Sequence, residues 1–178
     1  MKYYKIIDNK QVFFKGNVLY TEQGTIINPT EEQMINAGWQ VYIEPEPTNA
    51  EKLAAAKAEK IAQIEYYDAS DNVEQFTING TPMWLGHELR QQIRTSADAY
   101  EALGYENMTK VFNGIEFTFP IAVWRQMLNA LEVYAAEALN TTERHKNAIS
   151  SMDKIQDVID YDYTAGYPTK LEFNTVND

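Results

Sequence analysis

A stripe of apolar residues between positions 121 and 149 is the clearest pattern in the chain. Apolar side chains recur there at alternating steps of three and four residues, which places them on one face of an α-helix. The stripe consists of Ile121, Trp124, Leu128, Leu131, Ala135 and Ala138. Polar residues such as Arg125 and Glu132 lie on the opposite side. The pattern predicts a long core helix from about Pro120 to Ile149.

Two β-hairpins are predicted, one before and one after a shorter helix that spans about residues 86–103 and ends at Gly104. Their strands and turns are 75–78, Asn79-Gly80 and 81–85, then 109–112, Asn113-Gly114 and 115–119. Asn-Gly between apolar runs favours a two-residue hairpin turn, because both turn residues adopt positive φ. The side chains of the two hairpin–helix units do not align beyond the turns. We therefore interpret them as repeated architecture rather than as a duplication.

The segments around these elements also carry local signals. An alanine-rich helix is expected from about residue 49 to residue 67, with too few apolar positions for a convincing coiled-coil seam. After the long helix, Ser150 followed by Asp153 is typical of a helix cap, so we expect Ser150 to cap a last short helix. Residues 161–168 are turn-like, and residues 170–173 are compatible with a further strand.

The first 43 residues show a pattern of short strands with one helix. The predicted strands are 2–7, 11–15 and 39–43. Thr30 followed by Gln33 is typical of a capping box, in which each residue satisfies a free backbone N–H of the other. Gly38 is placed to end the same helix. A module of this size lies near the limit at which a chain folds independently.

A linker rich in proline and glutamate follows this module. Glu44-Pro45-Glu46-Pro47 cannot continue a helix or a central strand, and alternating prolines make a short stiff spacer. We therefore predict a small N-terminal α+β module over 1–43, a linker over 44–48 and a C-terminal domain over 49–178. The predicted fold class is α+β. A small β-rich N-terminal module precedes a domain of two β-hairpins packed on helices, one of them long and amphipathic.

Composition and charge exclude several classes of function. The 178 residues contain no cysteine, which excludes disulfides, thiolate metal sites and cysteine nucleophiles. The formal net charge is −11, and no basic block is present that would favour nucleic acid or an anionic membrane as a partner. Neither a signal peptide nor an apolar run long enough for a membrane span is recognisable, so we expect a soluble protein.

No pattern of catalytic or metal-binding residues stands out. His87-Glu88 would need a second histidine at Gln91 to form a zinc-binding helix motif. His145 continues the apolar stripe, and we expect it to be a structural histidine. The acidic residues of 68–74 lack the central glycine and the spacing of a calcium loop. We therefore predict a protein that is not an enzyme and that has no metal site and no cofactor.

The aromatic content is more informative, with 12 tyrosines, 7 phenylalanines and 3 tryptophans. Four of these residues are expected to fill the core: Trp84, Phe117, Phe119 and Trp124. Others combine aromatic anchors with turn residues or lie in the small module, which is typical of a partner interface. The candidate interface residues are Trp39, Tyr42, Tyr161, Tyr163, Tyr167 and Phe173. The alternative is that both ends fold back onto the same chain.

Several motifs, taken in order, resemble an uncharacterised domain family of bacteriophages and prophages over roughly residues 60–173. They are IAQIEYYDASD at 61–71, FTING at 76–80, MWL at 83–85, FTFP at 117–120 and YDYTAGYP at 161–168. The segment NPTEEQ at 28–33, with AGW at 37–39, is similar to short N-terminal modules of phage tail-region proteins. The resemblance supplies no catalytic residues.

The resemblance implies a non-enzymatic structural component of a bacteriophage virion, a tail- or fibre-associated adaptor that acts through protein–protein assembly. Its partners would be other phage structural proteins, such as tail-fibre, baseplate or portal-region subunits. It would form a homo-oligomer or be present in several copies in each particle, with neither nucleic acid nor a membrane as a partner. It would be assembled in the bacterial host cytoplasm and located in the virion. One alternative is a tail-fibre assembly chaperone, and a more distant one is a cell-wall hydrolase.

Overall fold

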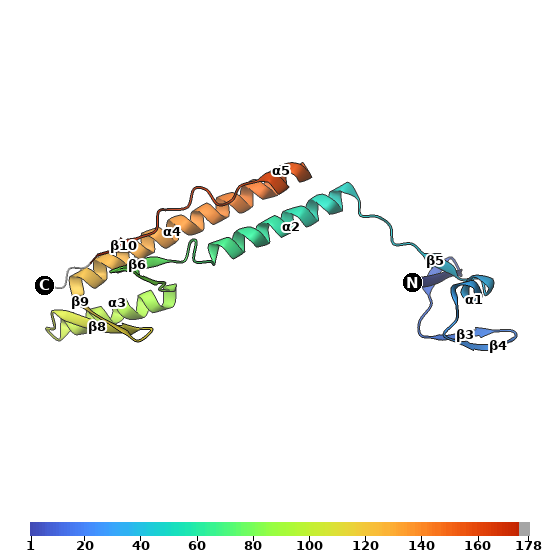
Figure 1. The fold of residues 1–178 in the computed structure, drawn as a ribbon, viewed down its shortest axis with the longest axis horizontal. Coiled ribbons are helices and arrows are strands. Elements are labelled where there is room, and N and C mark those ends of the chain that lie inside the picture. The colour runs from blue at the N-terminus through green and yellow to red at the C-terminus, as the bar shows by residue number, and fades with distance from the viewer. Residues whose placement is uncertain (175–178) are drawn as a thin grey trace. The chain divides into compact units, whose positions relative to one another are not determined.

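The computed structural model describes residues 1–174 and has the α+β class that the sequence predicts (Figure 1). The chain divides into two compact units, Met1–Thr48 (unit 1) and Asn49–Asp178 (unit 2). Residues 43–48, which include the proline–glutamate segment, contain neither helix nor strand. None of the helices within residues 1–174 combines the length and the apolar character that a membrane span needs.

Unit 1 consists of short strands and a single short helix. Its elements are β1 (Lys2–Ile7), β2 (Lys10–Phe13), β3 (Val18–Thr21), β4 (Gly24–Ile27), α1 (Glu31–Asn36) and β5 (Gln40–Tyr42). β1 pairs with β2 on one side and with β5 on the other, both antiparallel, while β3 and β4 form a separate hairpin. The predicted capping box is confirmed, because the Thr30 hydroxyl accepts from the Gln33 N–H and the Gln33 side chain accepts from the Thr30 N–H.

Unit 2 contains the two predicted hairpins and the long helix. Its elements are α2 (Asn49–Asp68), β6 (Phe76–Ile78), β7 (Thr81–Met83), α3 (His87–Ala102), β8 (Asn107–Phe112), β9 (Ile115–Pro120), α4 (Ile121–Ser151), α5 (Ile155–Asp160) and β10 (Glu172–Phe173). Asn79, Gly80, Asn113 and Gly114 have φ values of 49°, 76°, 50° and 80°. The two Asn-Gly turns are therefore confirmed.

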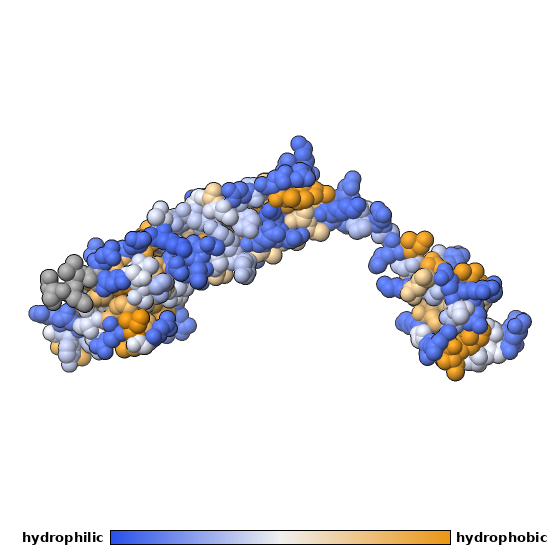
Figure 2. All heavy atoms as spheres, in the orientation of Figure 1, coloured by the Kyte–Doolittle hydropathy of each residue, from blue (hydrophilic) through white to orange (hydrophobic). Residues whose placement is uncertain are grey.

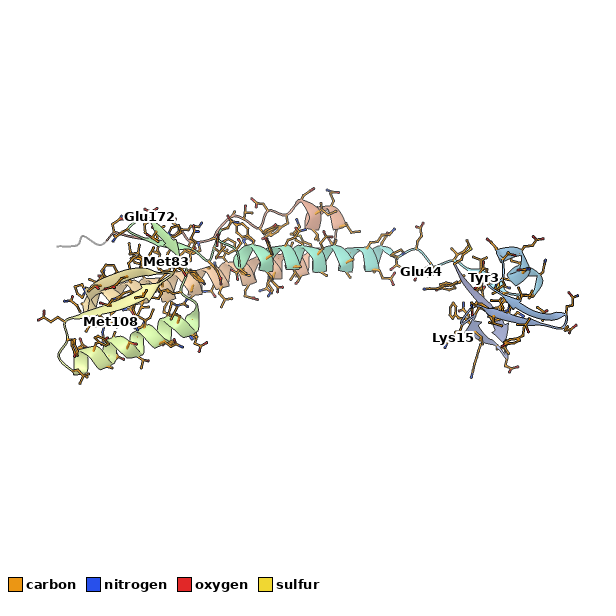
Figure 3. The ribbon with its side chains drawn as sticks, turned by 60° about the horizontal axis from the view of Figure 1, so that its bottom comes forward. Tyr3, Lys15, Glu44, Met83, Met108 and Glu172 are labelled. Atoms are coloured by element: carbon orange, nitrogen blue, oxygen red, sulfur yellow. The ribbon has the colours of Figure 1, made fainter. Side chains whose placement is uncertain are left out.

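The core of unit 2 forms where α4 meets α3 and the two hairpins. Trp124, Leu128 and Leu131 on α4 are all 0% exposed, and Phe117 and Phe119 of β9 are buried in the same cluster. The Trp124 indole N–H donates to the Met108 carbonyl at 2.8 Å, which satisfies the single polar atom of this large side chain. Figure 3 labels Met83 and Met108, one from each hairpin, which both belong to this core.

The long helix α4 also supports the rest of unit 2. Ile64 of α2, Ile149 of α4 and Val158 of α5 form a second buried cluster. α2 and α4 lie side by side in Figure 1, and the Asp68–Thr142 and Lys57–Ser150 hydrogen bonds show that they run antiparallel. The segment after α5 returns along α4 and ends in β10, which pairs in parallel with β6.

The predicted cap of the last helix is wrong. α4 continues to Ser151, and the Ser150 hydroxyl donates to the Lys146 carbonyl within that helix. Lys154 is instead the residue that precedes α5, and its side chain makes no capping hydrogen bond. Because α4 continues past Ser150, the hydroxyl of this serine bonds within α4 and does not cap α5.

Candidate functional site

Three aromatic side chains gather on one face of the β2-β1-β5 sheet, and we call this set, Tyr4, Phe13 and Tyr42, the aromatic face. Tyr4 is paired directly with Phe13, and Lys2, two residues earlier on β1, is paired with Tyr42. Directly paired and alternate residues point to the same side of a sheet. The rings contact one another, with centroids 5.1–6.4 Å apart.

The opposite face of this sheet is organised around Trp39. Its ring packs edge-on against Phe14 with centroids 5.2 Å apart, and the Lys5 ammonium lies 5.1 Å from the centre of the indole. Lys5 also lies next to Gly38, the residue that follows α1 and its cap. Of the two interface residues predicted in unit 1, Tyr42 therefore belongs to the aromatic face and Trp39 to the other side. Both side chains are half-buried.

Unit 1 leaves many apolar side chains in contact with solvent. Within residues 1–48 only Leu19 and Met34 are buried. On the sheet, Ile6 is 59% exposed and Phe13 is 39% exposed, and these two residues are diagonal neighbours beside Tyr4. Figure 2 shows hydrophobic residues at the surface of this unit. Neighbouring apolar side chains that reach the surface together are typical of an interaction site.

Charge separates the sheet from the rest of unit 1. All four lysines of residues 1–48 lie within the first 15 residues, where Asp8 is the single acid, so this segment carries +3. Residues 16–48 contain five glutamates and neither lysine nor arginine, which gives −5. The lysines are Lys2, Lys5, Lys10 and Lys15. The aromatic face thus lies on a basic sheet in a chain whose net charge is −11.

The other predicted interface residues contact their own chain. The C-terminal segment (residues 161–173) lies on α2, α4 and β6, and its four aromatic residues are half-buried there. Tyr163 packs on Tyr67 of α2, with ring centroids 5.8 Å apart, and Phe173 packs on Phe76 of β6 at 5.7 Å. Tyr161 and Tyr167 reach α4, where they hydrogen-bond with His145 and Thr142. A role of these side chains in partner binding stays a prediction.

His145 is a structural residue in this arrangement. Its Nε2 lies 2.9 Å from the Ala165 carbonyl, which can only accept, so Nε2 carries the proton and donates. Its Nδ1 lies 2.7 Å from the Tyr161 hydroxyl and, in the neutral ring, accepts from it. Both nitrogens are therefore used to hold the C-terminal segment, as expected for a structural histidine.

The hydroxyl of Thr142 extends this polar contact. It lies 2.7 Å from the Asp68 carboxylate, to which it donates, and 2.9 Å from the Tyr167 hydroxyl. One buried threonine of α4 thereby joins the end of α2 to the C-terminal segment. Asp68, which also belongs to the acidic run 68–74, serves here as a hydrogen-bond acceptor inside unit 2.

A small depression of about 210 Å³ in unit 2 is lined by several charged side chains. Its walls include Asp68, Glu74, Trp84, His87 and Arg90. Burial, with a further contribution from the nearby Asp68 carboxylate, raises the pKa of Glu74, while Arg90 and a hydrogen bond from Trp84 act in the opposite direction. Within residues 1–174, no group of three or more potential ligands is placed to hold a metal ion.

An ion pair between α3 and α4 borders this cavity and was not predicted from the sequence. Arg90 is 4% exposed, and its Nε and one terminal nitrogen donate to the two carboxylate oxygens of Glu132 at 3.1 and 3.3 Å. Its other terminal nitrogen donates to the Leu85 carbonyl at 2.6 Å. The spacing of Arg90 from the buried Ile93 and Ala97 on α3 would have been the signal for its burial. Because Arg90 lies on α3 and Glu132 lies on α4, the pair holds these two helices together.

Comparison of the chain with protein-family models, with curated proteins and with solved structures gives no match. The resemblance to a phage domain family therefore stays a prediction. The geometry of the described residues favours the aromatic face of unit 1 as the candidate site, since Phe13 and the neighbouring Ile6 are exposed there. In unit 2, by contrast, Arg90, Thr142 and His145 are bonded to their own chain.

Proposed function

We propose that this protein is a non-enzymatic assembly protein that binds its neighbours through the aromatic face of unit 1, while unit 2 acts as a rigid body. The observation that carries the proposal is a 48-residue unit that buries two side chains and exposes Ile6 and Phe13 beside one another on a sheet. A small unit gains stability by covering such a face with another protein surface, because the buried apolar area grows.

The proposed setting is a bacteriophage particle, in which the protein is a tail- or fibre-associated adaptor. The motifs at 61–71 and 161–168 and their order along the chain support this setting through the resemblance described above. The layout of two compact units also supports an adaptor, since one unit can bind a neighbour while the other occupies its own position. Repetition in a particle would strengthen weak individual contacts through high effective concentration.

Mass spectrometry of purified particles tests this setting. An adaptor is expected at a fixed copy number relative to the other structural proteins. If the chain is present in infected cells but missing from particles, it is an assembly chaperone and the adaptor role falls. Its absence from both would remove the phage setting altogether.

A pair of matched variants tests the surface. Ile6→Glu places a charge directly beside the aromatic face and is expected to reduce incorporation into particles at least tenfold, since an unpaired charge in an apolar interface is costly. Val111→Glu is the control, because Val111 is similarly exposed but lies on β8 of unit 2. Equal incorporation of both variants would contradict the assignment of the aromatic face.

A further inference from the structure

The outer edge of β2 has backbone groups directed away from its sheet. β1 and β2 are joined by the two-residue turn Asp8-Asn9, whose φ values are 49° and 59°. The residues that flank such a turn form a hydrogen-bonded pair, and every second pair along the hairpin does the same. The Phe14 N–H bonds to the Tyr3 carbonyl at 2.8 Å, which agrees with this alternation. The N–H and C=O groups of Gln11 and Phe13 therefore point outward.

The side chains beside this edge differ between its two faces. Phe13 and Gln11 lie on the side of the aromatic face, whereas Val12 and Lys10 lie on the other side, together with Lys5 of β1. All four residues of β2 are exposed. A strand placed against this edge would have Phe13 and Gln11 beside it on one face and Lys10 and Val12 on the other.

The charge of this edge favours a partner that differs from the protein itself. Lysine on an edge strand discourages identical strands from pairing, because each copy brings its own positive charge. The same lysines attract carboxylates, and residues 1–15 carry +3. Proline and bulges, which also protect edges, are not found in β2.

We propose that β2 accepts, as an added strand, an extended segment of another protein that has one apolar face and one acidic face. The apolar side chains of the segment would lie beside Phe13, and its carboxylates would lie near Lys10. Main-chain hydrogen bonds to Gln11 and Phe13 would supply affinity, and the two faces would supply specificity. This inference rests on the proposed function, since it names the kind of partner that the same surface binds.

Fluorescence anisotropy with the full chain tests the proposal. The probe is a labelled octapeptide of alternating valine and glutamate, and the comparison probe has lysine at every glutamate position. The glutamate peptide is expected to bind at least tenfold more tightly than the lysine peptide and to weaken as salt rises to about 0.5 M, since surface charges are then screened. Equal binding of the two peptides, or no saturable binding of the glutamate peptide, would overturn the proposal.

Two substitutions of Gln11 separate the contribution of its backbone N–H to peptide binding from that of its side chain. Gln11→Pro removes an outward N–H that makes no bond to β1, so the hairpin keeps its own hydrogen bonds, and proline is tolerated on an edge strand. Gln11→Ala removes the same side chain and keeps the N–H. We expect at least a tenfold loss of peptide binding for the proline variant and less than a twofold change for the alanine variant, with circular dichroism showing that both are folded. Equal binding of the two variants sinks the strand-addition model.

The outcomes also distinguish this inference from the proposed function. If Ile6→Glu fails to enter particles while Gln11→Pro enters normally, the aromatic face is an assembly surface and strand addition is wrong. If a labelled single-stranded oligonucleotide binds the chain and the glutamate peptide does not, the lysines bind nucleic acid and the inference falls. Concentration-dependent dimers that are lost in Gln11→Pro would identify a second copy as the occupant instead.

Discussion

At the scale of single residues, the sequence pattern locates the core but not the use of each polar group. Trp124, Phe117 and Phe119 are buried as expected from their positions in the apolar stripe and in the second hairpin. Trp84, which was also expected in the core, is half-buried and packs against it. The burial of Arg90 was missed, because a pattern of apolar positions does not identify a cation whose charge is neutralised by a distant partner. Likewise, sequence alone did not separate Tyr42 from Trp39, since the face that each occupies depends on strand register.

Leu128 provides the residue-scale test of the core. Leu128→Ala is expected to lower the free energy of unfolding of unit 2 by about 2–5 kcal/mol, because the side chain is 0% exposed and its removal leaves a cavity. Val133→Ala is the matched control on the same helix, with a side chain that is 59% exposed, and should change stability by less than about 0.5 kcal/mol. Urea denaturation measures both variants. Equal effects of the two substitutions would show that the orientation of α4 is wrong.

At the scale of elements, local signals predicted the hairpins with strong turns and missed those without them. The Asn-Gly turns at 79–80 and 113–114 adopt positive φ as expected. The β3–β4 hairpin was not predicted, because its turn residues Glu22 and Gln23 lack such a signal and have no positive φ. The parallel pairing of β10 with β6 joins segments almost 100 residues apart, so no local pattern specifies it.

The ion pair between α3 and α4 has a consequence for pH dependence. Hydrogen bonds from Arg90 hold the pKa of Glu132 below its ordinary value of 4.5, with the nearby positive charges acting in the same direction. A carboxyl whose folded-state pKa is depressed stabilises the protein fully above its unfolded-state pKa. This stabilisation is lost as the pH falls through the lower folded-state value. The pair therefore contributes at neutral pH and stops contributing in acid.

Thermal unfolding between pH 7 and pH 3 checks this linkage. Glu132→Gln is expected to have a lower midpoint than the unmodified chain at pH 7, and the difference should shrink as the pH falls below about 4.5. Glu116→Gln is a control, because Glu116 is an exposed glutamate on β9 for which no ion pair is described. A difference that stays constant across this range would contradict the assigned role of the Arg90–Glu132 pair.

At the scale of the whole molecule, the two units differ in how they use their apolar residues. Unit 2 buries a continuous cluster around α4 and holds its C-terminal segment through His145 and Thr142. Unit 1 buries Leu19 and Met34 and leaves Ile6 and Phe13 on a basic sheet. This contrast is the physical basis for the account, in which unit 2 is self-sufficient and unit 1 is completed by a partner. From the sequence, interface residues are expected at both ends of the chain, and a role of the C-terminal ones in partner binding stays a prediction.

Amide hydrogen exchange of residues 2–14, compared between the free protein and purified particles, shows whether a partner covers the sheet of unit 1. Covering the aromatic face and the β2 edge should slow exchange at Gln11 and Phe13 by at least about tenfold in the particle, because outward N–H groups exchange readily until they are bonded or buried. Exchange in the core of α4 around Leu128 should stay the same in both samples. Unchanged exchange over residues 2–14 in assembled particles would contradict the account.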